Sequence, residues 1–250
     1  MDPLFLQIIQ EAWKADFSGW DFSWLEGRYV EEEPAWDYRA LVLERMKGVQ
    51  AMVDMGTGGG EFFSTLRPYP PDTWVTEAYV PNVPIARNRL EPLGVKLVQV
   101  FDDNDLPLPG NHFDLAINRH ESFSGKELAR ILKPGGRFLT QQIGCQNSTR
   151  LNELLEETNT YEYAHETLEK QVASLVSAGF EILQAREDFP VAAFRDVAAV
   201  VYYLKVIPWQ IPGFTPEAYL EGLEKIHATI QREGELVVPE HRYLIEAVRH

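Results

Sequence analysis

A cluster of glycines that directly follows a short apolar run constrains the fold of this chain more than any other feature. The apolar run is Ala51–Met55, and the cluster holds Gly56, Gly58, Gly59 and Gly60. A short apolar run of this kind indicates a buried strand. Glycine lets the backbone turn tightly and approach a ligand closely. We therefore predict a strand that ends in a ligand-binding turn.

The spacing of the glycines separates two kinds of nucleotide-type loop. A dinucleotide loop has the pattern Gly-x-Gly-x-x-Gly, whose third glycine packs a helix against the strand. Counted from Gly56, that third position is occupied by Glu61. Asp54 also stands at the end of the strand, where its carboxylate would repel a pyrophosphate but could hold a cationic or hydroxyl-rich ligand. The spacing therefore argues against a nicotinamide dehydrogenase.

Strand and helix patterns alternate from residue 51 onward. We expect strands at residues 51–55, 73–77, 95–101, 113–118, 137–143 and 180–187, with closing strand material at 235–238 and 243–248. We expect helices at residues 83–93, 127–132, 147–157, 165–178, 192–206 and 216–232, and a break at 133–136. Alternation with short connections predicts a parallel sheet covered by helices on both faces.

The first 50 residues are aromatic and predicted to be helical. They hold four of the six tryptophans, Trp13, Trp20, Trp24 and Trp36, and a helix is expected between residues 31–34 and Gly48. This segment is either a helical layer packed on the core or a lid over a substrate pocket. We expect a single domain over residues 1–250: an aromatic cap (1–50), a cofactor-binding core (51–145), and the remaining sheet (146–250) with a substrate-side insertion at about 189–216.

Acidic and amide side chains stand at the ends of the next three strands. Glu77 ends the second strand, Asp102 and Asp103 follow the third, and Asn118 ends the fourth. Because ligands in an open α/β sheet bind beyond the carboxyl ends of the strands, these residues are candidates for binding. Glu77 lies about 20 residues after the glycines, where an acid can accept ribose hydroxyls. The alternatives are an exposed strand-end glutamate and an acidic surface turn.

Taken in order, these motifs resemble those of the class I S-adenosylmethionine-dependent methyltransferases, of the type 11 kind. Phe-Asp-Leu at residues 113–115 and Leu-Lys-Pro-Gly-Gly-Arg-Phe at 132–138 extend the resemblance over residues 50–145. It implies a Rossmann-like, doubly wound α/β sheet of seven strands, the last antiparallel, with an N-terminal helical extension and a helical insertion after the sixth strand. It also implies S-adenosylmethionine as the cofactor, held by Asp54, Gly56, Thr57, Gly58, Gly60, Glu77, Asp102, Asp103 and Asn118.

Candidate catalytic residues follow the fourth strand. Arg119, His120 and Glu121 are expected to open toward the transferred methyl group, and His120 could act as a base. The alternative is structural, with Arg119 and Glu121 forming an ion pair and His120 bonding to the backbone. In the insertion, Trp209 and Tyr203 are candidate substrate contacts, although packing of a helical cap explains them as well.

Composition and net charge limit the kinds of partner that we expect this chain to bind. The net charge is −15 and no dense Lys/Arg cluster is present, so we expect neither a nucleic-acid partner nor binding to an anionic membrane surface. The single Cys145 fits a reducing cytoplasm, and we expect no metal. The leading hypothesis is a methyltransferase that acts on a small molecule by in-line displacement. A tRNA- or rRNA-modifying enzyme and a non-catalytic S-adenosylmethionine-binding module are the alternatives, and the oligomeric state is left open.

Overall fold

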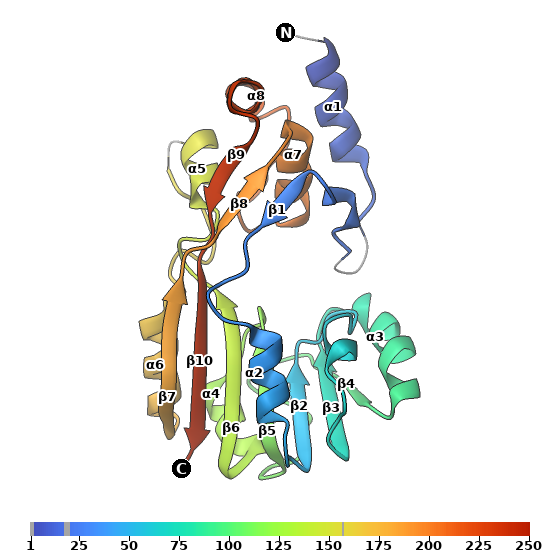
Figure 1. The fold of residues 1–250 in the computed structure, drawn as a ribbon, viewed down its shortest axis with the longest axis vertical. Coiled ribbons are helices and arrows are strands. Elements are labelled where there is room, and N and C mark those ends of the chain that lie inside the picture. The colour runs from blue at the N-terminus through green and yellow to red at the C-terminus, as the bar shows by residue number, and fades with distance from the viewer. Residues whose placement is uncertain (1–2, 18–20, 157) are drawn as a thin grey trace. The chain divides into compact units, whose positions relative to one another are not determined.

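The computed structural model describes residues 3–17, 21–156 and 158–250, which form two compact units (Figure 1). The large-sheet unit consists of residues 36–143, 167–187 and 243–250. The small-sheet unit consists of residues 1–35, 144–166 and 188–242. Each unit is thus assembled from three separate stretches of the chain.

The large-sheet unit is built on a seven-stranded sheet with the order β4-β3-β2-β5-β6-β10-β7. Its strands are β2 (Ala51–Met55), β3 (Asp72–Glu77), β4 (Lys96–Gln99), β5 (Phe113–Arg119), β6 (Leu132–Ile143), β7 (Phe180–Asp188) and β10 (Arg242–Arg249). The pairs β2/β3, β2/β5, β3/β4 and β5/β6 are parallel, and β10 runs against its neighbours (Figure 1). This confirms the predicted fold class, including the insertion after the sixth strand.

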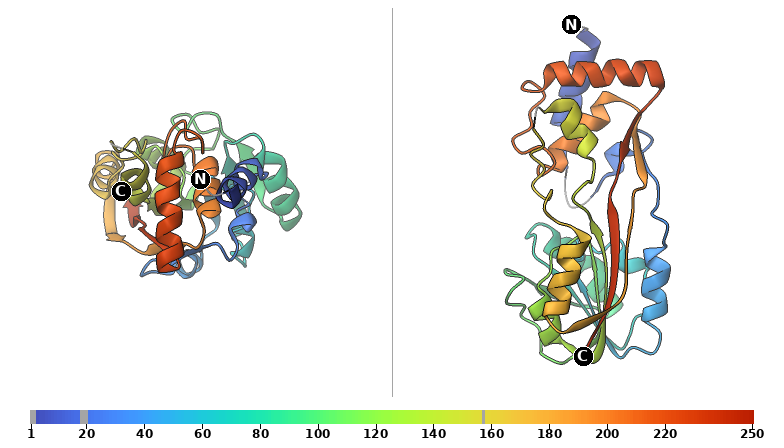
Figure 2. Two further views of the ribbon diagram at one scale, coloured as in Figure 1. Left: turned by 90° about the horizontal axis from the view of Figure 1, so that it is seen from above. Right: turned by 90° about the vertical axis from the view of Figure 1, so that its left-hand side faces the viewer.

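Helices cover both faces of this sheet. They are α2 (Tyr38–Arg45), α3 (Asn82–Leu90), α4 (Gly125–Ile131) and α6 (Leu168–Ser177), with the short turns η2 (Phe63–Thr65) and η3 (Glu91–Leu93). Met52 packs in one buried cluster with Val42 of α2, whereas the next residue, Val53, packs in another with Leu128 of α4 and Leu175 of α6. Successive strand residues point to opposite faces, so β2 is buried on both sides. Figure 2 shows α2 and α6 on opposite sides of the strands.

Two predicted boundaries in this unit are wrong for identifiable reasons. The strand expected to begin at Arg137 begins at Leu132, and the break expected at residues 133–136 is an irregularity inside it, where the pairing with β5 passes from Leu132 to Arg137. The helix expected to begin at residues 31–34 begins instead at Tyr38. Asp37 caps that helix by accepting the Ala40 N–H at 2.9 Å, which satisfies one of the free N–H groups of the first turn.

The small-sheet unit contains an antiparallel sheet with the order β1-β8-β9. Its elements are α1 (Pro3–Lys14), η1 (Ser23–Leu25), β1 (Tyr29–Glu31), α5 (Thr149–Leu155), β8 (Val191–Phe194), α7 (Val197–Val206), α8 (Leu220–Glu233) and β9 (Leu236–Pro239). The strand material expected at 235–238 is therefore β9 of this sheet. The helix expected at 192–206 begins only at Val197, where Asp196 caps it by accepting the Ala199 N–H at 2.8 Å.

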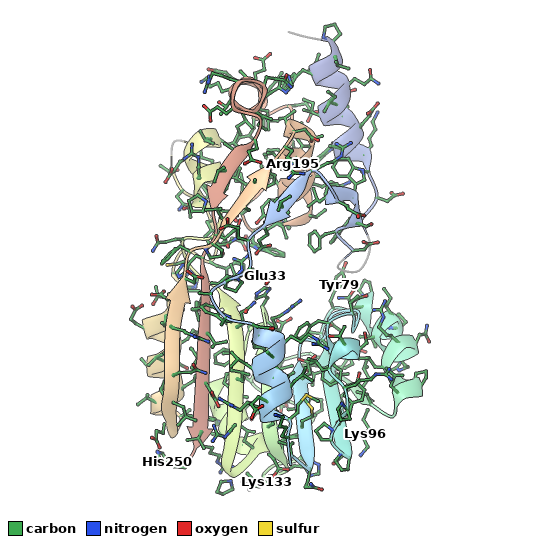
Figure 3. All side chains as sticks on the ribbon, viewed as in Figure 1. Glu33, Tyr79, Lys96, Lys133, Arg195 and His250 are labelled. Atoms are coloured by element: carbon green, nitrogen blue, oxygen red, sulfur yellow. The ribbon has the colours of Figure 1, made fainter. Side chains whose placement is uncertain are left out.

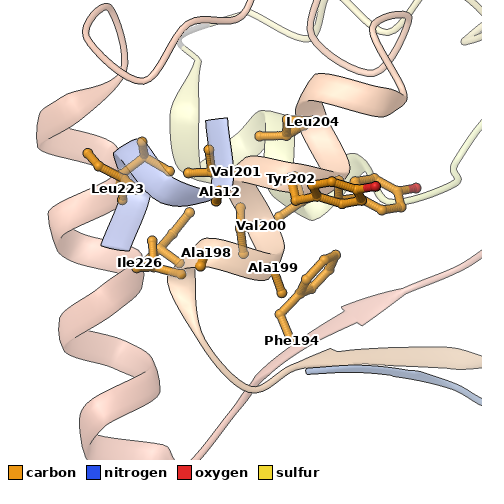
Figure 4. Close-up of a cluster of buried hydrophobic side chains, with 14 of the residues drawn as sticks. Ala12, Phe194, Ala198, Ala199, Val200, Val201, Tyr202, Leu204, Leu223 and Ile226 are labelled. Carbon is orange, nitrogen blue, oxygen red and sulfur yellow. The ribbon is translucent and has the colours of Figure 1, made fainter. Parts of the chain in front are cut away.

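The core of this unit surrounds α7, in which every residue except Lys205 is buried (Figure 4). A helix that is apolar on all sides requires neighbours on all sides. Ala12 of α1 and Ile226 of α8 belong to the same cluster, and Trp24 stacks on Tyr202 with ring centroids 4.5 Å apart. The aromatic N-terminal residues of this unit therefore pack into its core, while Trp20 lies outside the described residues.

No helix in the described part of the chain is both long enough and apolar enough to cross a lipid bilayer.

Candidate functional site

The glycine loop after β2 needs glycine for two separate reasons. Gly56, Gly58 and Gly60 have φ angles of 72°, 63° and 80°, which disfavour other residues. A Cβ at Gly56 would also lie 2.3 Å from Glu121 Cγ, and one at Gly60 would lie 2.8 Å from Leu90 Cδ1. The loop is therefore pressed against the residues that follow β5 on one side and against α3 on the other.

Glu77 ties the end of β3 to this loop. Its Oε2 accepts the Gly58 N–H at 2.6 Å and its Oε1 accepts the Tyr79 N–H at 2.7 Å. Only 3% of Glu77 is exposed, so it is not the exposed strand-end residue of the alternative interpretation. Burial raises the pKa of its carboxyl, while the bonds from backbone N–H groups act in the opposite direction.

Asp54 lies at the end of β2 and is 5% exposed. Burial raises its pKa to about 7, with Thr57 and Arg119 acting in the opposite direction and Glu77 adding to the rise. A carboxyl with such a pKa is ready to ionise when a cation arrives. The position is thus unfavourable for an anionic ligand and favourable for a positive one.

Glu121 adds a further carboxyl at the glycine loop, where its side chain covers Gly56. Burial raises its pKa, and the nearby Asp103 adds to this. Ser122 links the two acids: its N–H donates to Glu121 at 3.1 Å and its hydroxyl donates to Asp103. The structural alternative required an ion pair between Arg119 and Glu121, which the described part of the structure does not contain. The Arg119 guanidinium lies instead 4.1 Å from the centroid of the Phe62 ring.

Asn118 is fully buried and fastens three strand ends. Its Oδ1 accepts from Thr140 Oγ1 at 2.9 Å and from the Gln142 side chain, while its amide donates to Met55 O at 3.4 Å. These bonds account for its burial. A direct contact between Asn118 and a cofactor stays a prediction.

His120 follows β5 in a left-handed backbone conformation with φ 61°. Its N–H donates to Gln141 O at 2.9 Å, and its ring Nε2 lies 3.2 Å from Gln141 Nε2. A backbone strained in this way persists only where its surroundings hold it. The catalytic roles of Arg119, His120 and Glu121 stay predictions.

The loop after β4 contributes an acid and an exposed ring. Asp102 accepts the Asn104 N–H at 2.8 Å and forms an Asx turn, as the surface-turn alternative expects. Phe101 is 83% exposed, and Tyr79 and Val80, which follow the neighbouring β3, are 57% and 64% exposed. Figure 3 shows Tyr79 at one end of the sheet and Lys96 and Lys133 at the other.

Sequence reasoning missed these three apolar residues. The available signal was an apolar side chain within two or three residues of a strand end and near an acid, Glu77 before Tyr79 and Asp102 after Phe101. Such a set suits a flat ring with polar edges, because it combines apolar contact area with nearby hydrogen-bond acceptors.

The two candidate substrate contacts lie in the small-sheet unit. Tyr203 is buried, and its hydroxyl lies 3.2 Å from Ser148 Oγ. Trp209 packs edge-on against Tyr163, with ring centroids 6.2 Å apart. Their substrate roles stay predictions. Within the described residues, no three His, Cys, Asp or Glu side chains are grouped as metal ligands.

Comparison with known proteins agrees with this geometry. Residues 53–140 match the family model of the methyltransferase domain. A ubiquinone/menaquinone biosynthesis C-methyltransferase of Laribacter hongkongensis is 34% identical over 80 residues, which are 29% of this chain and 33% of that protein. A relative of the same name from Chromobacterium violaceum is 32% identical over the same shares. The chain thus matches about a third of the length of these relatives.

Solved structures match over much more of the chain. A protein of Bacillus halodurans is 19% identical with a TM-score of 0.62, and the match covers 85% of this chain and 98% of that one. A geranyl diphosphate methyltransferase in complex with GPP and sinefungin is 14% identical with a TM-score of 0.54, over 100% and 99% of the two chains. Residues 53–140 thus match a methyltransferase domain, and the likeness to these solved structures shows that the chain shares their fold.

Proposed function

We propose that this chain transfers a methyl group from S-adenosylmethionine to a small-molecule acceptor by in-line displacement. The observation that carries the proposal is the set of three carboxyls at the glycine loop: Asp54, Glu77 and Glu121. Burial raises the pKa of each, and a nearby positive charge favours the ionised form of all three. A sulfonium with an α-ammonium group supplies such charge, whereas a pyrophosphate would be repelled.

The remaining features of the site fit the other parts of this cofactor. A carboxylate such as Glu77 can accept the hydroxyls of a ribose, as it now accepts two backbone N–H groups. The exposed Tyr79, Val80 and Phe101 offer apolar contact to an adenine ring. Asp102 and Asp103, which follow Phe101 in the chain, can accept hydrogen bonds from its polar edge. These assignments follow from the chemistry of the residues present.

The cofactor supplies an electrophilic methyl group on a sulfonium. The lone pair of the acceptor forms the new bond as the carbon–sulfur bond breaks, and that electron pair stays on sulfur. The contribution of the protein is then chiefly to hold the acceptor in line at near-attack distance. A base is needed only when the acceptor must also lose a proton. Asn118 and Gln141 hold the end of β5 and the residue after it by hydrogen bonds, so this part of the site is suited to position the acceptor.

A small-molecule acceptor is supported by charge and by the relatives. The net charge of −15 is unfavourable for phosphate backbones, whose neutralisation supplies most nucleic-acid affinity. The relatives are named for quinone biosynthesis and a solved neighbour for geranyl diphosphate, all small molecules. A tRNA or rRNA acceptor and a binding module without catalysis are the alternatives that the test must exclude.

Thermal unfolding with and without ligands tests the proposal, because a ligand that binds the native state stabilises it. We expect S-adenosylmethionine and S-adenosylhomocysteine to raise the melting temperature and NADH to leave it unchanged. A panel of small acceptors, with release of S-adenosylhomocysteine as the readout, should then identify a substrate. Stabilisation without release on any acceptor would favour the binding module, and release on RNA alone would favour the nucleic-acid enzyme.

A further inference from the structure

A chain of side-chain hydrogen bonds runs from Trp36 to His120 inside the large-sheet unit. The indole Nε1–H of Trp36 donates to Gln141 Oε1 at 2.7 Å, and Gln141 Nε2 lies 3.2 Å from His120 Nε2. Trp36 is 6% exposed and Gln141 is 7% exposed. These hydrogen bonds thus link Trp36, which precedes α2, to His120, which follows β5, through the side chain of Gln141 in β6.

The direction of these bonds is determined by chemistry. An indole N–H can only donate, so the carbonyl oxygen of the Gln141 amide must face Trp36. The amide nitrogen of Gln141 then faces His120, and an amide NH₂ can also only donate. His120 Nε2 must therefore accept with its lone pair. The ring proton is placed by this network on Nδ1 of a neutral imidazole.

Both ends of this chain are held in place. Asp37 caps α2 directly after Trp36, and the Tyr38 hydroxyl donates to Asn118 O at 2.8 Å. The Arg186 guanidinium lies 5.1 Å from the centroid of the Trp36 ring.

At the His120 end, the backbone N–H of His120 donates to Gln141 O at 2.9 Å, and the φ angle of His120 is 61°. The packing therefore leaves the bonded side chains little freedom to rearrange.

We propose that Trp36 and Gln141 are positioning residues that hold His120 as the Nδ1–H tautomer. The lone pair that a general base would use is then bonded to Gln141, and His120 serves the acceptor as a hydrogen-bond donor. The expected acceptor therefore carries an oxygen or nitrogen that accepts this bond and does not lose its proton to His120. This role in the reaction rests on the proposed function, whereas the tautomer itself does not.

Nitrogen NMR of the full-length, 15N-labelled chain tests the tautomer directly. Long-range 1H–15N spectra distinguish a protonated from an unprotonated ring nitrogen, and the loss of one signal set in His120→Gln assigns the residue. At about pH 8, where an ordinary imidazole is neutral, we expect Nδ1 to be protonated and Nε2 to be unprotonated. A protonated Nε2 in the wild-type chain would overturn the proposal.

Two variants change the bonding in opposite ways. Gln141→Glu offers His120 a carboxylate that can only accept, so the proton should move to Nε2. Trp36→Phe keeps an aromatic ring but removes the donor that orients the amide, so the Nε2–H form should gain population. Trp74→Phe is the matched control, because it removes an indole bond to Asp72 Oδ1 of 2.8 Å in the same unit. An unchanged tautomer in Gln141→Glu, or equal spectra for Trp36→Phe and Trp74→Phe, would contradict the proposal.

Binding and turnover separate this inference from the proposed function. We expect Trp36→Phe to keep the affinity for S-adenosylmethionine within about twofold and to lower kcat with the identified acceptor by about tenfold or more. Trp74→Phe should leave both unchanged. If the wild-type chain does not bind S-adenosylmethionine, the proposed function fails while the tautomer can still be correct. If kcat is unchanged in Trp36→Phe although the tautomer shifts, the positioning role fails alone.

Discussion

At the scale of single residues, a comparison of two glycines separates the effect of backbone strain from the effect of steric contact. Gly56 and Gly94 both have positive φ angles, 72° and 82°. A Cβ at Gly56 would meet Glu121, whereas one at Gly94 would have no heavy atom within 4 Å. The two positions therefore share the conformational cost of a side chain but differ in the contact.

Alanine substitution at these two glycines should show that difference. We expect Gly56→Ala and Gly94→Ala each to lose about 1 kcal/mol in the free energy of unfolding, with a further loss at Gly56 from the contact. Only Gly56→Ala should weaken S-adenosylmethionine binding, by about tenfold or more, because Glu121 must move off the loop. Chemical denaturation and titration calorimetry measure the two effects. Equal affinities in the two variants would contradict the role of this contact.

Ionised Asp54 should lower the free energy of unfolding, although its charge favours binding of a cationic cofactor. Its pKa is raised to about 7 in the folded chain, so ionisation costs the folded state more than the unfolded state. The free energy of unfolding should therefore fall as the pH rises from the unfolded pKa of about 4 through about 7. Asp54→Asn removes this loss and should stabilise the chain by about 2 kcal/mol at pH 8 and by less at pH 5.

The same variant should bind S-adenosylmethionine more weakly, because one of the carboxyls that favour a cation is gone. Asp105→Asn, at an exposed position of the loop after β4, is the control for a change in overall charge.

Unfolding curves of the wild type and Asp54→Asn at both pH values give the difference in stability. A gain that is the same at the two pH values would show that ionisation of Asp54 is not its cause.

Local sequence patterns revealed the strand-end acids but not their partners. Asp54 and Glu77 could be placed because the end of an apolar run is visible in the sequence. The bond from Trp36 to Gln141 joins residues 105 positions apart, and no local pattern encodes it. The same applies to the contact of Glu121 with Gly56. The chemistry of a site is thus more predictable than the hydrogen bonds that hold it.

At the scale of elements, predictions failed where burial removed the usual signals. Val191–Phe194 and Val197–Val206 form one apolar stretch with little periodicity, because α7 is buried on all sides. Two charged residues, Arg195 and Asp196, mark the boundary between the strand and the helix, and Asp196 caps the helix. Strands such as β2 were predicted correctly because a short apolar run that ends in glycines permits few other structures.

Glu246 of β10 joins elements that are far apart in the chain. Its buried carboxylate accepts from Arg45 of α2 at 2.6 and 3.0 Å, from Arg137 of β6 at 2.8 Å, and from Gln184 of β7 at 2.9 Å. Burial acts to raise its pKa, but the bonds from these partners outweigh it and the pKa is lowered. Glu246 should thus stabilise the packing of α2 and the three strands.

Replacing Glu246 should cost stability in a pH-dependent way. We expect Glu246→Gln to lower the free energy of unfolding by about 2 kcal/mol near pH 7. Because the folded pKa is lowered, this contribution is present above the unfolded pKa of about 4.3 and is lost as the pH falls through the folded value. Urea unfolding at several pH values measures it. The same loss at about pH 3 as near pH 7 would show that the charge of Glu246 is not involved.

At the scale of the whole molecule, the chain passes repeatedly between its two units. One of the passages lies between Ile143 and Gly144, directly at the end of β6. No linker composition marks such a point, so a sequence can predict the sheet without predicting which segments share a unit. The single domain over residues 1–250 stays a prediction.

The overall charge leads to a separate prediction about RNA. With a net charge of −15, the chain should not retain tRNA in a filter-binding assay even at about 50 mM salt, where electrostatic binding is strong. A nucleic-acid methyltransferase of comparable size is a suitable positive control. Retention that weakens steeply with added salt would contradict a small-molecule acceptor and favour the RNA-modifying alternative.

Titration calorimetry of the wild-type chain and Glu77→Ala with S-adenosylmethionine tests the central claim most directly. We expect saturable binding of S-adenosylmethionine and S-adenosylhomocysteine to the wild type, and affinity for both that is lower by about tenfold or more in Glu77→Ala. Glu91→Ala, at an exposed glutamate of the same unit, should bind as the wild type does. The account would be contradicted if neither sulfur ligand binds the wild-type chain, or if Glu77→Ala binds them as tightly as Glu91→Ala.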